Sequence, residues 1–414
     1  MKAKIKLNDY KFNTIKISGS KNSSLPIIAG SILCDEQVTI NNVPNIDDVN
    51  ALITLLKKIG YDIHFNNNTV IVNPNKINKK EYKYKEIKKL RGSYYLMGSI
   101  IGNNILYCNF SFLFPGGCKL GTRPINYHIE AFRNMGLSVA TKKRKIIISG
   151  IINRYIHTLS FPSVGTTINI ILSSCKNENK TIIYNASIEP EVIDLCNFLI
   201  SMGVDIKIEN RTITIRGNSY LHHTNYTVME DRIEAGTFLI LGAIHKGIKI
   251  TNVNPSNLTI LINLLQNIGY TIKSNKNSIT LFNNNVDIKP FDIKLEPFPG
   301  FPTDLGPLLC VLASQISGTS TIKETVFLDR YSHISELKKL NINIKKDKNN
   351  IIITGKNNII NNKVISKDLR CSACLLIAGS LNTNYTIIQN IELLFRGYED
   401  IKYKLNKLGI DFII

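Results

Sequence analysis

The sequence predicts an α/β protein of two domains, built from six β-α-β-type repeats with three repeats in each domain. A short phrase recurs about every 70 residues along the chain, each time before an alternating apolar pattern. A second segment, apolar on most helical faces, also occurs six times. Alternation of helix-period and strand-period segments is typical of α/β domains.

The repeated phrase marks the end of an amphipathic helix and the start of a strand. In the first copy, Asp47 to Ile59 has helical spacing and Gly60 follows it. A glycine just past the last helical residue suits a left-handed C-cap. The six copies begin at Lys58, Asn134, Ser201, Asn267, Lys339 and Lys407.

The more apolar segments predict six buried helices, because a helix without a polar face is covered on all sides. They are expected at Lys21 to Leu33, Arg91 to Gly102, Val164 to Cys175, Asp231 to Lys246, Thr303 to Ser317 and Asp368 to Leu381. Sheets are expected to wrap around them. We expect one discontinuous domain of residues 1–20 and 230–414, and a second domain of residues 21–229.

Composition indicates a globular protein that is neither a membrane protein nor a secreted one. The chain has 414 residues, of which 43% are hydrophobic and 20% charged. No apolar run reaches the roughly 18 residues that a membrane span needs. The first residues, Met1 to Lys6, lead into a strand-like pattern without the apolar core of a signal peptide. We therefore expect a soluble, cytoplasmic protein without a membrane partner.

The formal net charge of +20 raises the question of nucleic-acid binding. The lysines, however, lie along the whole chain among abundant Asn and Ile, and no zinc finger, RNA-recognition signature or basic arm occurs. We expect no nucleic-acid partner.

The eight cysteines do not form the framework of a small disulfide-rich protein. Cys371 and Cys374 have CxxC spacing, but no second pair follows at zinc-site distance, and the segment around them is apolar and helical. We therefore expect no metal site and no redox site there.

The segment from Pro115 to Pro124 carries Cys118 among glycines and between Lys119 and Arg123. Glycines let backbone N–H groups approach a ligand, and neighbouring cations favour both a thiolate and a bound anion. The segment therefore predicts a reactive cysteine beside an anionic substrate. The alternative is an inert thiol in a glycine-rich turn.

The starts of the buried helices carry cations that capping does not explain. Lys21, Arg91, Arg232 and Arg370 stand at helix N-termini, where a positive charge opposes the helix dipole by about 0.3 to 1 kcal/mol. A bound anion would remove this conflict. We infer that these helix starts converge on one anion-binding cleft between the two domains.

Nine short motifs occur in register along the chain. They are Ser18 to Asn22, Pro115 to Pro124, Phe161 to Gly165, Glu189 to Glu191, Asp231 to Glu234, Phe301 to Asp304, Glu324 to Phe327, Asp368 to Arg370 and Arg396 to Glu399. Together they closely resemble the UDP-N-acetylglucosamine 1-carboxyvinyltransferases, a family of enolpyruvyl transferases. The resemblance covers essentially the whole chain.

The resemblance implies an inside-out α/β barrel of two domains with three repeats each. It also implies transfer of the enolpyruvyl group of phosphoenolpyruvate to the 3′-hydroxyl of UDP-N-acetylglucosamine with release of phosphate, the first committed step of peptidoglycan synthesis. Both partners are small-molecule substrates, no metal or organic cofactor is required, and we expect a monomer.

The resemblance also implies roles for individual residues. Phosphoenolpyruvate is expected to bind Lys21, Arg123 and Arg396, with Arg91 and Arg370 completing the cationic cluster. Asp304 corresponds to the base for the sugar hydroxyl. Cys118 corresponds to the loop cysteine that donates a proton in the family and is alkylated by fosfomycin. Lys21 is the alternative proton donor, and the sequence leaves that choice open.

On the nucleotide side, the resemblance assigns the diphosphate to helix N–H groups at Ser163, Val164 and Gly165. Asn22 and the backbone of Val326 are expected to contact the sugar. The remaining expected substrate-binding positions are Pro124, Ile125, Asn126, Tyr127, Arg330 and Asp368.

Four positions depart from the family pattern. Asn126 stands where many members have an Asp near the uracil, and Phe161 where some have a Lys beside the diphosphate. Ile188 replaces a common Arg, and Phe395 replaces an Asp that usually precedes the Arg corresponding to Arg396. The first two departures concern nucleotide contacts rather than chemistry, whereas Phe395 is expected to affect the orientation of Arg396.

Two alternatives remain from the sequence. One is the related enolpyruvyl transferase that acts on shikimate 3-phosphate, against which the Cys118 segment and Phe161 to Gly165 argue. The other is a non-catalytic anion-binding protein that retains the fold. The residues that argue against it are Lys21, Cys118, Arg123, Asp304 and Arg396.

Overall fold

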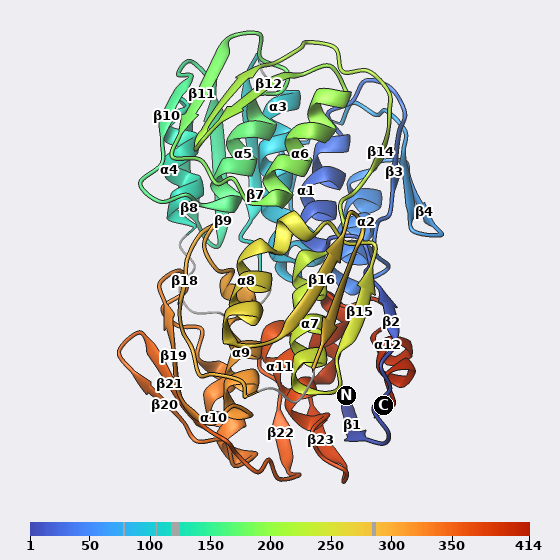
Figure 1. Ribbon diagram of the computed structural model, residues 1–414. Helices are drawn as coiled ribbons and strands as arrows, with labels where there is room; N and C mark the ends of the chain where they lie inside the picture. Colours follow the sequence, from blue (N-terminus) through green and yellow to red (C-terminus); the bar gives the residue numbers. More distant parts are fainter. Residues whose placement is uncertain (78, 105, 117–124, 284–286) are drawn as a thin grey trace. The chain divides into compact units, whose positions relative to one another are not determined.

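The computed structural model describes residues 1–77, 79–104, 106–116, 125–283 and 287–414 (Figure 1). Within these ranges the chain forms two compact units. Unit 1 contains residues 1–18 and 230–414, and unit 2 contains residues 19–116 and 125–229. Each unit has its own hydrophobic core. The boundaries expected from the sequence concern independently folding domains, and they stay a prediction.

Each unit contains three four-stranded sheets among the described residues. In unit 2 the strand orders are β10 (Ile156–Thr158), β11 (Lys180–Tyr184), β13 (Thr212–Arg216), β12 (Asp205–Glu209); β6 (Glu81–Tyr82), β7 (Cys108–Leu113), β9 (Lys145–Gly150), β8 (Ser138–Lys142); and β14 (Thr224–Thr227), β3 (Val38–Asn41), β5 (Thr69–Val72), β4 (Ile63–Asn66). In unit 1 they are β18 (Asp292–Leu295), β19 (Gly318–Glu324), β21 (Asn350–Gly355), β20 (Ile344–Asp347); β22 (Lys363–Ile365), β23 (Thr386–Gln389), β1 (Lys2–Leu7), β24 (Ile410–Ile413); and β2 (Thr14–Lys16), β15 (Ile248–Thr251), β17 (Ser278–Phe282), β16 (Thr271–Asn275). In every sheet the first two strands are parallel and the remaining pairs are antiparallel.

The repeat is a parallel β-α-β unit followed by a second helix and an antiparallel strand pair. The segment β10-α5-β11-α6-β12-β13 shows it without interruption, with α5 at Val164–Ser174 and α6 at Pro190–Ser201. The predicted β-α-β repeat, with one buried and one amphipathic helix, is therefore confirmed.

The corresponding helices of the other repeats fall into the two predicted kinds. The buried ones are α1 (Lys21–Ser31), α3 (Tyr95–Asn103), α7 (Arg232–Ile244), α9 (Gly306–Ser314) and α11 (Leu369–Gly379). The amphipathic ones are α2 (Asp47–Ile59), α4 (Asn126–Asn134), α8 (Thr259–Ile268), α10 (Ser332–Lys339) and α12 (Ile401–Lys407). Short 3-10 helices are η1 (Lys85–Lys88), η2 (Arg91–Tyr94), η3 (Pro255–Leu258), η4 (Thr303–Leu305) and η5 (Ile391–Arg396).

The small, apolar helices lie inside the units, as their composition predicts. Every residue of α11 is buried, whereas α2 buries one face and exposes the other. Figure 1 shows, for each unit taken by itself, helices in the interior and sheets around them. The amphipathic helices end as expected, with Gly60 at φ 116° and, in the fifth copy, Asn341 at φ 66°. Asn takes the left-handed conformation more readily than most residues, so it replaces glycine at this end.

The described cysteines behave as core residues. Cys371 and Cys374 are buried in α11, and the other five described cysteines are buried as well. Cys118, Arg123 and Pro124 lie outside the described residues. Within the described part of the chain, no helix combines the length and apolar character needed to cross a membrane.

Two strands lie next to the points where the chain passes from one unit to the other. Strand β2 leads directly into α1 of unit 2, yet it pairs in parallel with β15 of unit 1. Strand β14 leads into α7 of unit 1, yet it pairs in parallel with β3 of unit 2. One sheet of each unit therefore depends on a chain segment that continues into the other unit.

A buried ion pair fixes the end of the N-terminal segment in unit 1. The Lys404 ammonium lies 2.6 Å from Glu234 Oε1 and donates to Ser18 Oγ at 2.6 Å. The Ser18 N–H donates to Glu234 Oε2 at 2.8 Å. Burial raises the pKa of the Glu234 carboxyl, and Lys404 opposes this shift. The pair therefore ties α7, α12 and the segment after β2 together.

We predict that Lys404→Met lowers the free energy of unfolding by about 3 to 5 kcal/mol at pH 7, because it leaves a buried carboxylate without its cation. The loss should shrink as the pH falls through the raised pKa of Glu234, since a protonated carboxyl needs no cation. Urea denaturation at several pH values measures both effects. The matched control is Lys407→Met, which removes an exposed lysine from the same helix. Equal stability of the two variants would contradict the prediction.

Candidate active site

Asp304 lies between two buried guanidinium groups in unit 1. It belongs to η4, directly before α9. Its Oδ1 accepts a hydrogen bond from Arg330 Nη1 at 2.6 Å, and its Oδ2 accepts from Arg370 Nη2 at 2.7 Å and Nε at 3.1 Å. The Asp304 side chain is 23% exposed, against 4% for Arg330 and 7% for Arg370. The structure therefore brings together three residues that the sequence assigned to substrate binding.

The two arginines decide the charge state of Asp304. Burial acts to raise the pKa of its carboxyl, but Arg370 and Arg330 outweigh burial and hold that pKa well below its usual range. Asp304 is thus a carboxylate at neutral pH. In this arrangement it is also a weak base, because proton uptake would disrupt two ion pairs.

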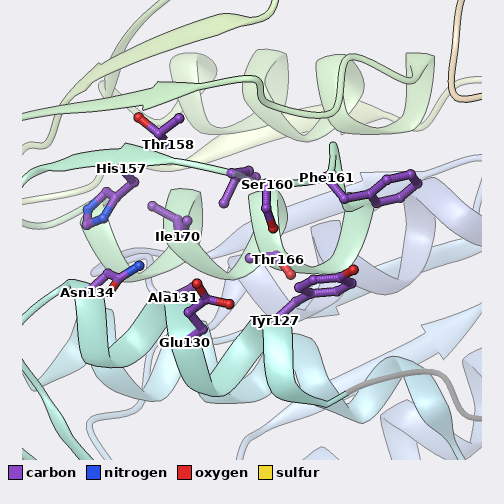
Figure 2. A pocket seen from close by; sticks show the side chains of 11 residues that line it. Tyr127, Glu130, Ala131, Asn134, His157, Thr158, Ser160, Phe161, Thr166 and Ile170 are labelled. Carbon is purple, nitrogen blue, oxygen red and sulfur yellow. The ribbon is translucent and has the colours of Figure 1, made fainter.

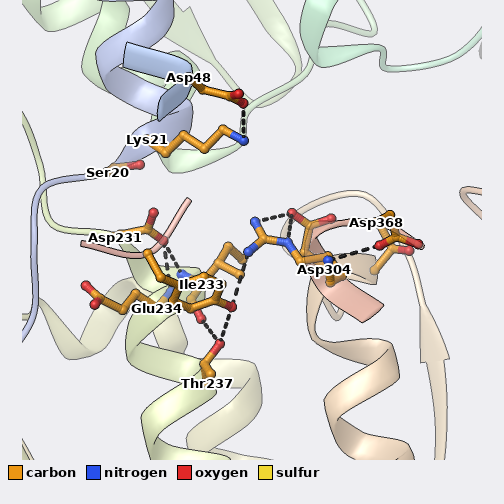
Figure 3. Close-up of polar contacts among 12 residues, drawn as sticks. Ser20, Lys21, Asp48, Asp231, Ile233, Glu234, Thr237, Asp304 and Asp368 are labelled. Carbon is orange, nitrogen blue, oxygen red and sulfur yellow. Dashed lines mark hydrogen bonds and ion pairs between the residues drawn. The ribbon is translucent and has the colours of Figure 1, made fainter. Parts of the chain in front are cut away.

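Arg370 is held from several directions. Asp368 caps α11, and its Oδ1 accepts from the N–H groups of Arg370 and Cys371 at 2.9 and 3.0 Å (Figure 3). Its Oδ2 accepts from Ser332 Oγ at 2.5 Å. Arg370 Nη1 also donates to the hydroxyl of buried Tyr398 at 3.3 Å. Asp368, a predicted substrate contact, therefore serves as a helix cap here.

Lys21 opens α1 in unit 2 and is paired with a carboxylate. Its Nζ lies 2.6 Å from Asp48 Oδ2, and the two side chains are only 12% and 7% exposed (Figure 3). Ser20 caps the helix by accepting from the Ser23 N–H at 3.3 Å, and Asn22 is half-buried. The prediction that a bound anion relieves the conflict between cation and helix dipole stays a prediction for Lys21 and Arg370. In the structure, a protein carboxylate already lies beside each of them.

Two of the other predicted cations, Arg91 and Arg232, occupy the expected helix starts, whereas Arg396 ends a 3-10 helix. Arg91 begins η2, and its guanidinium lies 5.6 Å from the ring centre of Tyr94. Arg232 begins α7, 5.9 Å from the ring centre of Phe298. Arg396 ends η5 and is half-buried, and Phe395 beside it packs against the core of unit 1.

The predicted diphosphate residues form the start of α5. Ser163 caps this helix, accepting from the Thr166 N–H at 3.4 Å and from the Thr166 hydroxyl at 3.0 Å. The N–H of Ser163 itself donates to Phe161 O at 2.7 Å, so it is already used. The N–H groups of Val164 and Gly165 lie in the first turn, where a helix offers them no carbonyl.

A small cavity lies beside this helix start (Figure 2). Its volume of about 20 Å³ suits one water molecule, and Tyr127, Asn134, His157 and Phe161 are among its lining residues. The rings of Tyr127 and Phe161 stack with centroids 6.4 Å apart and planes 18° apart. Ile125 and Asn126 precede Tyr127 at the start of α4, where Asn126 is exposed.

A buried polar chain behind these residues was not predicted from the sequence. Asn169 Oδ1 accepts from the Gly98 N–H at 2.9 Å, so its amide nitrogen faces His128 Nδ1 at 2.8 Å. His128 therefore accepts through Nδ1 and stacks on Tyr94 at 4.8 Å. Burial and the nearby Arg91 lower the pKa of His128 to about 3. The signal in the sequence was Asn169 itself, a polar residue within an apolar helix that needs a buried partner.

Val326 differs in detail from its expected role. Its N–H donates to Glu324 Oε1 at 2.8 Å. A contact with a sugar would therefore use its carbonyl group rather than its N–H.

Comparison with known proteins identifies the family to which the chain belongs. The profile of the family described as EPSP synthase (3-phosphoshikimate 1-carboxyvinyltransferase) matches residues 11–405. UDP-N-acetylglucosamine 1-carboxyvinyltransferase 2 of Bacillus subtilis is 39% identical over 399 residues, covering 96% of this chain and 92% of the relative. UDP-N-acetylglucosamine 1-carboxyvinyltransferase 1 of Clostridium acetobutylicum is 40% identical over 401 residues, covering 95% of each chain.

The chain belongs to the UDP-N-acetylglucosamine 1-carboxyvinyltransferase family of enolpyruvyl transferases. Solved structures agree on the fold. The enolpyruvyl transferase NikO from Streptomyces tendae matches with a TM-score of 0.88 at 21% identity, covering 99% of this chain and 98% of NikO. An EPSP synthase from Acinetobacter baumannii matches with a TM-score of 0.72 at 18% identity over the full length of both chains. The predicted two-part α/β fold of this family is therefore confirmed.

We predict that Asp304→Asn lowers the free energy of unfolding by about 3 to 5 kcal/mol at pH 7, because two buried guanidinium groups lose their carboxylate. Since the folded-state pKa of Asp304 is depressed, its contribution is full above the unfolded pKa of about 3.9 and is lost as the pH falls further. Denaturation at pH 7 and at pH 3 checks this pH dependence. Asp411→Asn is the control, because Asp411 forms only a partly exposed pair with Lys6 at 3.8 Å. An Asp304 variant as stable as the Asp411 variant at pH 7 would refute the prediction.

Proposed function

We propose that this protein is a transferase that moves the enolpyruvyl group of phosphoenolpyruvate to the 3′-hydroxyl of UDP-N-acetylglucosamine, releasing phosphate. This is the first committed step of peptidoglycan synthesis. The observation that carries the proposal is 39 to 40% identity, over nearly the whole chain, to enzymes named for this transfer.

The reaction requires an addition followed by an elimination. In the addition, the sugar oxygen bonds to C2 of phosphoenolpyruvate, the hydroxyl proton leaves to a base, and C3 receives a proton. In the elimination, the C2–O bond to phosphate breaks, and C3 loses a proton to restore the double bond. We assign the base to Asp304 and the proton donor to Cys118 or Lys21, and that choice remains open.

The cations are assigned to the charged groups of phosphoenolpyruvate. Lys21, Arg123 and Arg396 are proposed to hold its phosphate and carboxylate, with Arg91 and Arg370 beside them. Fixing two reactants in line supplies about 7 to 11 kcal/mol of barrier reduction, so this set matters as much as the acid and the base.

The ion pair between Asp304 and Arg370 supports a role for Asp304 as a base whose pKa rises when substrate binds. Arg370 is shared between Asp304 and, in this proposal, the substrate anion. An anion that takes part of the Arg370 hydrogen bonding weakens the stabilisation of the Asp304 carboxylate, and the pKa of Asp304 then rises. Asp304 would gain basicity when there is a hydroxyl to deprotonate.

The nucleotide is assigned to the start of α5 and the neighbouring end of α4. The N–H groups of Val164 and Gly165, together with the helix dipole, suit a diphosphate without needing a cationic side chain. Phe161 stands where some family members carry a Lys, and it stacks on Tyr127. We propose that Pro124, Ile125, Asn126 and Tyr127 lie along the nucleotide.

The wider setting follows from the substrates. Both are small, water-soluble anions that occur in the cytoplasm, so we propose a cytoplasmic protein without a nucleic-acid or membrane partner. That it is a monomer is a separate proposal. The second candidate function is transfer to shikimate 3-phosphate, the activity after which the matching family profile is named.

A phosphate-release assay decides between the acceptors. We predict release from phosphoenolpyruvate with UDP-N-acetylglucosamine and none above background with shikimate 3-phosphate. Asp304→Asn should lower kcat by about 10² to 10⁴-fold, the usual contribution of a general base, with the nucleotide sugar still bound. Circular dichroism verifies that the variant is folded, and Asp411→Asn is the control.

Phosphate release with shikimate 3-phosphate as acceptor, and none with UDP-N-acetylglucosamine, would establish the second candidate function. No release with either acceptor would leave a non-catalytic protein of this fold. Normal turnover by Asp304→Asn would remove Asp304 from the base role while leaving the transfer reaction in place.

A further inference from the structure

Glu324 is a buried carboxylate to which no role has been assigned. It ends β19 in unit 1 and is only 2% exposed. Its Oε1 accepts from the N–H groups of Val326 and Phe327 at 2.8 and 3.0 Å, and its Oε2 accepts from Thr303 Oγ1 at 2.5 Å. Thr303 directly precedes Asp304 in the sequence. One carboxylate thus contacts both the turn that carries Asp304 and the turn that leads to Arg330.

The hydrogen-bond donors fix the direction of this chain of contacts. The Thr303 hydroxyl has one proton, and the carboxylate of Glu324 can only accept. Thr303 therefore donates to Glu324 and presents a lone pair to Arg330 Nη1 at 3.2 Å. The same Nη1 donates to Asp304 Oδ1 at 2.6 Å. The order is Glu324, Thr303, Arg330, Asp304, and each step depends on the one before.

A second route leads from Glu324 to Arg330 through an aromatic ring. By binding the N–H of Phe327, Glu324 shapes the turn that carries this side chain. The Arg330 guanidinium lies 4.6 Å from the centre of the Phe327 ring, a distance at which cation–π attraction operates. Both the hydroxyl and the ring that contact Arg330 are therefore set by Glu324.

Arg330 depends on these contacts because it has few others. Its side chain is 4% exposed, and within the described ranges its Nε makes no hydrogen bond. The guanidinium contacts Thr303 and Asp304 through Nη1, and it lies over the ring of Phe327. Loss of the Thr303 acceptor or displacement of the ring would leave Arg330 free to move from Asp304.

We propose that Glu324 is a positioning residue, which places Arg330 against the proposed base Asp304 through Thr303 and Phe327. This inference rests on the proposed function for its effect on catalysis, but the placement itself is a property of unit 1. Glu324→Gln breaks the donor pattern, because an amide cannot accept from both sides. Its nitrogen would face either Thr303 or the two backbone N–H groups.

The test compares Glu324→Gln, Thr303→Val, the double variant and Thr303→Ser. Thr303→Val removes the hydroxyl without touching the backbone at Val326, whereas Thr303→Ser keeps it. The control is Glu336→Gln, another carboxylate of unit 1 that is 2% exposed and accepts from Lys339 Nζ and the Ile365 N–H. Phosphate release is measured across pH with phosphoenolpyruvate and UDP-N-acetylglucosamine, and crystal structures of Glu324→Gln and wild type are compared.

We expect Thr303→Val to lower kcat by about 10 to 100-fold with KM for the nucleotide sugar changed less than about threefold, because small misplacement of a reacting group costs about this much. Glu324→Gln should lower kcat similarly and also raise KM, since it frees the turn at Val326. The double variant should match Glu324→Gln in kcat, because both changes act on the same contact. Thr303→Ser should restore kcat, and Glu336→Gln should lose stability only.

The position of the acid limb in the plot of kcat against pH distinguishes the two roles, because a purely structural role of Glu324 would leave it unchanged. With Arg330 displaced, Asp304 gains a proton more readily, so the limb should move to higher pH in Glu324→Gln and Thr303→Val. Multiplying effects in the double variant, an unmoved acid limb, or Arg330 Nη1 still at Asp304 Oδ1 in the variant crystal would each overturn the proposal. If wild type itself releases no phosphate, the proposed function fails, while the crystal comparison still decides whether Glu324 places Arg330.

Discussion

The sharing of one carboxylate by two buried guanidinium groups is the constraint on which the candidate site of unit 1 depends. Arg330 and Arg370 are almost fully covered, and a buried charge without a counter-charge costs several kcal/mol. Asp304 is the counter-charge of both arginines, so its protonation would leave uncompensated positive charge in the interior. The pairing that stabilises this site is the same pairing that weakens the proposed base. In the proposed function, substrate binding and base strength are therefore linked through Arg370.

The repeat explains why the polar groups gather at helix starts. In each repeat the first helix is apolar along its length because it is buried, so its first turn is where polar side chains can be placed. Ser20, Ser163, Asp231 and Asp368 all cap such helices through their side chains. Capping then brings Lys21, Arg232 and Arg370 into the first turn beside them. A fold that buries its helices thus concentrates polar and cationic side chains at their N-terminal ends.

Local periodicity predicted much of the fold. It did not predict which residues distant in the sequence contact one another. The bounds of α2 follow from spacing and a C-terminal glycine, and they agree with the structure at both ends. Motifs identified Lys21, Asp304 and Arg370, but not that Asp48 lies beside Lys21, because that contact joins two different helices. The role proposed for Glu324 was not predicted for the same reason, because it depends on a contact with Thr303, which is distant in sequence. The pairing of β2 with β15 and of β14 with β3 was also not predicted, because strand pairing carries no local signal.

The net charge of +20 and the charge of the site are separate matters. Several lysines form exposed pairs such as Lys83 with Glu81 and Lys294 with Glu296, which contribute little to stability because solvent screens them. Within unit 2, by contrast, Lys21 faces Asp48, and within unit 1, Arg370 faces Asp304. An anion that binds either cation must compete with the carboxylate already paired with it. In the proposed function, phosphoenolpyruvate carries both a phosphate and a carboxylate, so it can compete at more than one cation. We therefore propose that the paired cations of each unit, and not the net charge of the protein, favour a substrate with two anionic groups.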